Sequence, residues 1–226
     1  MKKNFICVAI VIIICIMAIC FIEGRQVGKM DVRKCVVAID VGHGGFDPGK
    51  VGVTGSLEKD INLSIAKKLK RRLEKIGITV VLTREKDEDL SLEGEGKKMS
   101  DMRERVRKIN ESKAILSISI HQNSFTQESV KGYQVFYYEG SEQAKQLAEY
   151  IQEHIHTVVK DDNHRMAKSN NDYYVLKQVE CPIVIVECGF LSNYEEEALL
   201  LEEDYQEKLA KGMEKGILAY LEENYD

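Results

Sequence analysis

The sequence has 226 residues, a formal net charge of −5 and no tryptophan, and this length suits one α/β domain with a short additional segment. A nucleic-acid-binding protein would carry a basic surface, whereas lysine and glutamate are mixed along this chain. The composition therefore argues against DNA or RNA as a partner.

The chain begins with a long apolar segment. Lys2 and Lys3 precede residues 5–22, which are all apolar, and this charge layout is typical of a secretory signal or a signal anchor. The apolar run exceeds an ordinary signal core, and no clear small-residue cleavage site follows it. We therefore favour an uncleaved membrane anchor at residues 1–24 over a cleaved signal peptide. Both interpretations predict an exported protein.

A short polar stalk, residues 25–34, leads to one catalytic domain expected at residues 35–226. Apolar runs predict strands, and patterns of helical period predict helices. The expected strands are 35–41, 79–83, 114–121, 132–138 and 182–187; the expected helices are 57–76, 100–112, 141–159, 194–202 and 204–222. Residues 85–99 are expected to form a loop, and residues 173–176 an extended segment. Strands that alternate with helices predict a single α/β domain, in which helices cover a parallel or mixed sheet.

Three expected strands lead to a residue that can bind a metal or transfer a proton. His43 follows the first strand, His121 ends the third, and Glu187 ends the last. Sites in open α/β sheets form beyond the carboxyl ends of the strands. Glu58 falls in the first turn of the 57–76 helix, on its inward apolar face, with Ser56 as the expected N-cap.

Two histidines and two glutamates at one sheet edge predict a zinc hydrolase. Catalytic zinc takes three protein ligands, and two histidines with one glutamate are a known set. The remaining acid would then act as general base. A phosphate-binding loop is a poorer interpretation of residues 44–51, because Val51 stands where a serine or threonine would have to bind magnesium.

Three of the six cysteines, Cys35, Cys181 and Cys188, lie outside the apolar segment. Their odd number and the absence of C-x-x-C spacing indicate free thiols. Strand alternation should turn Cys188 away from Glu187.

Five motifs in this chain resemble those of the zinc-dependent N-acetylmuramoyl-L-alanine amidases, the family called amidase type 3. The motifs are Ile39-Asp40-Val41-Gly42-His43-Gly44-Gly45-x-Asp47-Pro48-Gly49, Gly55-x-x-Glu58-Lys59, Thr83-Arg84, Ser117-Ile118-Ser119-Ile120-His121-x-Asn123-Ser124 and Val186-Glu187-x-Gly189-Phe190-Leu191-Ser192-Asn193. They follow the family's order over residues 35–222. The chain departs from the family pattern at Val41, Gln122 and Cys188, but none of these changes removes an expected ligand.

The resemblance implies a mixed sheet of about six strands with helices on both faces. It implies that His43, Glu58 and His121 bind Zn²⁺ and that Glu187 is the catalytic acid–base. The implied substrate is peptidoglycan, glycan strands with stem peptides, cut between the lactyl group of N-acetylmuramic acid and L-alanine. Asn123, Arg84 and Arg165 are candidate substrate contacts.

An anchored catalytic domain without repeats is similar to the sporulation amidases of endospore formers. This similarity implies action in spore cortex maturation through muramic-δ-lactam, a membrane-anchored location outside the cytoplasm in the forespore intermembrane space, and an accessory sporulation protein as partner. Two alternatives remain open: a zinc peptidase that cuts within the stem peptide, and a non-catalytic wall-binding relative.

Overall fold

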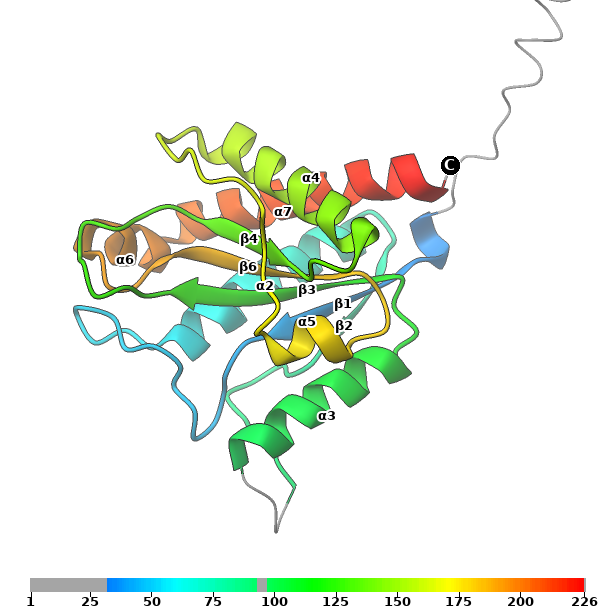
Figure 1. The fold of residues 1–226 in the computed structure, drawn as a ribbon, viewed down its shortest axis with the longest axis horizontal. Helices are drawn as coiled ribbons and strands as arrows, with labels where there is room; N and C mark the ends of the chain where they lie inside the picture. The colour runs from blue at the N-terminus through cyan, green and yellow to red at the C-terminus, as the bar shows by residue number, and fades with distance from the viewer. Residues whose placement is uncertain (1–31, 93–96, 226) are drawn as a thin grey trace, which may run out of the picture. The chain divides into compact units, whose positions relative to one another are not determined.

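The computed structural model describes residues 32–92 and 97–225 (Figure 1). The predicted anchor, residues 1–24, and most of the predicted stalk lie outside the described residues. Of the helices within the described ranges, none has the length and hydropathy needed to cross a membrane.

The centre of the domain is a six-stranded sheet in the order β2-β1-β3-β6-β4-β5. The strands are β1 (Val36–Val41), β2 (Thr79–Leu82), β3 (Leu116–Asn123), β4 (Gln134–Tyr137), β5 (Lys168–Ser169) and β6 (Ile183–Phe190). Strands β2, β1, β3 and β6 are parallel, whereas β4 runs antiparallel to β6 and parallel to β5. The predicted mixed sheet of six strands is confirmed. Because β1, β3 and β6 are parallel, their carboxyl ends meet at one edge.

Helices cover both faces of this sheet. The elements are η1 (Val32–Lys34), α2 (Glu58–Lys75), α3 (Lys97–Glu111), α4 (Glu142–Val159), α5 (Tyr174–Gln178), α6 (Tyr194–Leu201) and α7 (Glu203–Tyr225). Figure 1 shows α3 and α5 on one side of the sheet and α4 on the other. Helix α2 packs on β1, β2 and β3, and side-chain pairs such as Arg72 with Glu214 join α2 to α7.

Alternate side chains of each strand point to opposite faces of the sheet and pack against the helices on those faces. Ala38 of β1 and Ile185 of β6 belong to an apolar cluster that also contains Val106 of α3 and Val175 of α5. Since side chains alternate along a strand, Glu187 lies on the same face as Ile185. Helices α3 and α5 therefore cover the face of the sheet on which Glu187 lies.

Two local predictions were wrong. Residues 173–176 were expected to be extended, but α5 is a helix whose buried Val175 and Leu176 complete the cluster on that face. Ser56 is not the N-cap of α2: the cap position is Leu57, without a side-chain hydrogen bond. The Ser56 hydroxyl instead donates to Oε1 of buried Glu197 at 2.6 Å. The carboxylate of Glu197, far along the chain, thus fixes the segment that precedes α2. The local sequence does not reveal this contact.

Candidate active site

The loop after β1 turns sharply, so that His43 faces His121. His43 has a left-handed backbone with a φ of 61°, and any side chain at position 42 would collide with the His121 ring. Arg84 and Arg105 are buried, and each donates to the His43 carbonyl oxygen at 2.6 Å. Two guanidinium groups therefore hold this strained turn, because a buried carbonyl without a donor would destabilise it.

Glu58 reaches the same point from the first turn of α2. Its side chain is only 3% exposed, which confirms the predicted inward orientation. Oε2 accepts a hydrogen bond from the backbone amide of Lys50 at 2.8 Å, and Oε1 accepts one from that of Gln122 at 3.0 Å. These bonds tie the helix to the glycine-rich loop and to β3, so the carboxylate has little freedom to move.

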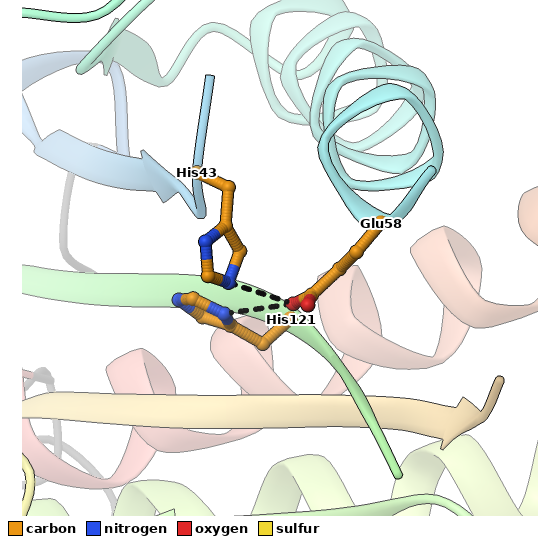
Figure 2. Close-up of side chains that lie close together, drawn as sticks. All are labelled: His43, Glu58 and His121. Carbon is orange, nitrogen blue, oxygen red and sulfur yellow. Dashed lines mark hydrogen bonds and ion pairs between the residues drawn. The ribbon is translucent and has the colours of Figure 1, made fainter. Parts of the chain in front are cut away.

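His43, Glu58 and His121 converge, as Figure 2 shows. His43 Nε2 lies 3.2 Å and His121 Nδ1 lies 3.0 Å from the same oxygen, Glu58 Oε1. The two rings meet edge to face with centroids 5.0 Å apart, and one ligand atom from each residue lies within 4.8 Å of the others. Two imidazole nitrogens and a carboxylate oxygen are a donor set that suits a divalent cation such as zinc.

The charges of this cluster favour a cation. Burial opposes ionisation of Glu58, but hydrogen bonds from His121 and His43 outweigh it and hold the pKa of Glu58 well below its usual range. Burial likewise opposes the charged form of His121, whereas the bond to Glu58 raises the pKa of His121. Glu58 is therefore ionised at neutral pH and presents a negative charge between the two rings.

Asp47 is a residue of the cluster that the sequence analysis missed. Its Oδ2 lies 2.9 Å from His43 Nδ1, and its Oδ1 accepts from the Gly49 amide at 3.1 Å. When a metal binds at the cluster, a carboxylate on Nδ1 would keep the ring proton on that nitrogen and leave the lone pair of Nε2 for the metal. Its position four residues after His43, in the same glycine-rich loop, was the available signal.

Glu187 lies next to the cluster on β6. It pairs with His121 in the parallel register of β3 and β6. Its side chain is buried, and Oε2 has no hydrogen-bond partner among residues 32–92 and 97–225. Burial raises the pKa of Glu187 to about 7. His43, His121 and Glu187 line one pocket, together with Tyr173.

Arg84 contacts the His43 loop and does not line the pocket. Its side chain is buried rather than exposed. Within residues 32–92 and 97–225, its guanidinium donates to backbone carbonyl oxygens, those of Val41, Gly42, His43, Lys59 and Lys86. The structure thus indicates that Arg84 holds the His43 loop, and its substrate contact remains a prediction.

Asn123 and Arg165 lie near the sheet edge but do not line the pocket. Asn123 is half-buried at the end of β3, and its Oδ1 accepts from the Ser124 amide at 2.8 Å. Arg165 is half-buried and donates to the carbonyl oxygen of Lys131 at 2.9 Å, with its guanidinium 5.0 Å from the centre of the Phe190 ring. Both remain predictions.

Among the described residues, Cys181 and Cys188 are free thiols, as predicted, and Cys35 forms no disulfide with either of them. Cys188 is completely buried, and burial raises the pKa of its thiol. Its Sγ lies 3.7 Å from the carbonyl oxygen of Val186, and it does not line the pocket that contains Glu187. Cys188 therefore has neither the thiolate nor the position of a ligand.

Comparisons with known proteins agree with this geometry. The N-acetylmuramoyl-L-alanine amidase family matches residues 37–219. The germination-specific N-acetylmuramoyl-L-alanine amidase of Bacillus subtilis (strain 168) is 39% identical over 195 residues, which cover 84% of this chain and 81% of that protein.

Solved structures of relatives have the same fold. The CwlD amidase from Clostridioides difficile, determined in complex with the GerS lipoprotein, is 40% identical with a TM-score of 0.80, over 83% of this chain and 98% of that one. The catalytic domain of CwlV, an N-acetylmuramoyl-L-alanine amidase from Bacillus (Paenibacillus) polymyxa var. colistinus, is 31% identical with a TM-score of 0.73, over 83% and 98%. The matched region includes every element that carries the cluster, and the chain therefore belongs to the N-acetylmuramoyl-L-alanine amidase family of enzymes.

Proposed function

We propose that this amidase is zinc-dependent and hydrolyses the amide bond between the lactyl group of N-acetylmuramic acid and L-alanine of the stem peptide. The observation that carries the proposal is the convergence of His43, Glu58 and His121 beside a buried carboxylate, Glu187, one oxygen of which has no partner among the described residues. Three donors for a metal and one free acid–base group are what metal-assisted amide hydrolysis requires.

His43, Glu58 and His121 are the proposed zinc ligands. Their donor set is that of three-ligand catalytic sites, which keep a fourth position open. Asp47 keeps His43 in the tautomer that can bind a metal. Zinc bound there would supply Lewis-acid chemistry, because it polarises a carbonyl oxygen and makes water more acidic.

Glu187 is the proposed acid–base residue. An amine leaves poorly unless it is protonated, so one residue must take a proton from the attacking water and later give it to the nitrogen of L-alanine. A pKa of about 7 suits both transfers near neutral pH. Oε2 is the atom available for them, since no described residue donates to it.

Asn123 and Arg165 are proposed to contact the substrate outside the pocket. Arg165 is fixed by Lys131 and by the Phe190 ring, beside the strand that carries Glu187. A guanidinium held in this way suits a carboxylate of the stem peptide.

We further propose that the substrate is spore cortex peptidoglycan, in which amide hydrolysis precedes muramic-δ-lactam formation. Support comes from the similarity to the germination-specific amidase of Bacillus subtilis and to CwlD from Clostridioides difficile. The latter was solved with a lipoprotein, GerS, and this supports an accessory sporulation protein as a partner here.

Residues 1–24 are proposed to anchor the protein in the membrane, with residues 25–34 as a stalk. Their basic start and uninterrupted apolar run support this assignment. The domain at residues 35–226 would then lie outside the cytoplasm, in the forespore intermembrane space.

Glu187→Gln should bind zinc as the wild type does and lose about 10²–10⁴-fold in kcat, the usual contribution of general acid–base catalysis. Mass spectrometry of muropeptides treated with the full-length protein measures the loss. The wild type should release intact stem peptides with an N-terminal alanine. Cleavage inside the stem peptide would favour the peptidase alternative, and absence of any release would favour a wall-binding role.

Asp47→Asn should weaken zinc binding by about 10–100-fold, because outer carboxylates orient the histidine ligands of metal sites. Competition with a chromogenic chelator measures the affinity. Asp162→Asn, a change of an exposed acid outside the cluster, is the matched control. Equal affinity in the two variants would contradict the role assigned to Asp47.

Deletion of the gene should yield spores whose cortex lacks muramic-δ-lactam, because the stem peptide must leave before the lactam can close. Muropeptide profiles of purified spores measure this. The wild-type gene should restore the lactam, whereas the Glu187→Gln gene should not. A deletion strain with normal lactam content would rule out the cortex role.

The full-length protein should sediment with membranes after cell breakage, and removal of residues 2–24 should abolish its export. An apolar run of this length is sufficient to span a bilayer. Intact-mass analysis of the membrane and soluble fractions distinguishes the interpretations: the full mass in the membrane fraction is expected for an anchor, and a soluble form shortened at its N-terminus would establish cleavage.

A further inference from the structure

Tyr173 is a pocket residue that belongs to none of the five motifs. It precedes α5, in the segment that joins β5 to β6. Its ring meets the Phe136 ring edge to face, with centroids 5.9 Å apart, and its backbone amide donates to Asn170 Oδ1 at 3.1 Å. The ring and the backbone are thus held separately, while the side chain lines the pocket with Glu187.

The two oxygens of Glu187 have different surroundings. Oε1 accepts from the Tyr173 hydroxyl at 3.5 Å, whereas Oε2 is buried and has no partner in the described part of the chain. A separation of 3.5 Å is long for this bond, but catalytic hydrogen bonds in ligand-free sites commonly shorten when substrate binds. A carboxylate with a single side-chain donor is oriented by that donor.

We propose that Tyr173 is a positioning residue for amide hydrolysis: its hydroxyl donates to Oε1 of Glu187 and so presents Oε2 to the reacting atoms. This inference rests on the acid–base role proposed above for Glu187.

The different surroundings of the two Glu187 oxygens allow a balanced series of proton transfers. Oε2 takes a proton from water as the C–O bond forms, and returns it to the amide nitrogen as the C–N bond breaks. Tyr173 keeps its own proton throughout. Burial and the nearby Glu187 charge raise the pKa of Tyr173 to about 12, so the phenol remains a donor at every pH at which the enzyme would work.

A different role is open to a tyrosine in this position, namely donation directly to the substrate carbonyl oxygen. A double-mutant cycle distinguishes donation to Glu187 from donation to the substrate. A donor that acts through Glu187 has no effect once the carboxylate is gone, whereas a donor to the substrate keeps its effect.

The experiment compares Tyr173→Phe, Glu187→Ala and the double variant in the full-length protein, with kcat and KM measured by release of stem peptides. Tyr173→Phe should lower kcat about 10-fold, roughly the effect of one hydrogen bond to a charged group, with KM and zinc content unchanged. In the Glu187→Ala background the same change should alter the residual rate less than about 2-fold.

Tyr138→Phe is the matched control. Tyr138 packs against the same apolar cluster as Tyr173 but does not line the pocket, so its hydroxyl should be dispensable. The Tyr173→Phe ring keeps the contact with Phe136, and the thermal midpoint should match that of the control.

Three results would overturn the proposal. These are an unchanged kcat in Tyr173→Phe, a rise in KM alone, and a full 10-fold loss that persists without Glu187. If Glu187 is not the acid–base residue, the result differs from these three, because Glu187→Ala would then itself retain a wild-type kcat.

Discussion

Glu58 places an ionised carboxylate in the interior, where α2, the loop after β1 and the end of β3 meet. An isolated buried charge would be strongly destabilising, so the surrounding chain has to supply donors. It does so with two backbone amides and two imidazole rings. The requirement to satisfy one carboxylate thereby sets the positions of both histidines. A cation bound at this point would be attracted by the same negative charge on Glu58.

The loop that carries His43 depends on a second set of buried charges. Arg84 and Arg105 direct their guanidinium groups at the carbonyl oxygens of Val41 and His43. Arg105 is in turn neutralised by Asp40 and Asp101. The left-handed backbone of His43 is costly by itself, and these bonds offset that cost. Hydrogen bonds from two side chains thus hold the irregular loop where a strand would be held by its neighbours.

The alternation of side chains along β6 places Glu187, the proposed acid–base residue, on one face of the sheet. Glu187 faces α3 and α5, whereas Cys188 belongs to the opposite face of β6. Helix α5 is short, yet it closes the pocket because its two buried aliphatic residues join the apolar cluster of α3. Tyr173 precedes this helix, so the packing of α5 also determines where its hydroxyl lies. Stability of that layer and the proposed geometry of catalysis are therefore coupled.

Several features of this protein were determined by the sequence alone. Apolar runs and helical periods predicted the α/β class and most elements. His43, which follows β1, and His121 and Glu187, which lie near the carboxyl ends of β3 and β6, predicted the cluster, because parallel strands bring these ends together. Sequence did not predict α5, the cap of α2 or the buried state of Arg84. Those features depend on partners far along the chain: the α3 cluster for α5, Glu197 for Ser56, and the carbonyls of the His43 loop for Arg84. The different surroundings of the two Glu187 oxygens were likewise decided only by tertiary structure, since a hydroxyl from residue 173 reaches residue 187 through packing and not through any local pattern.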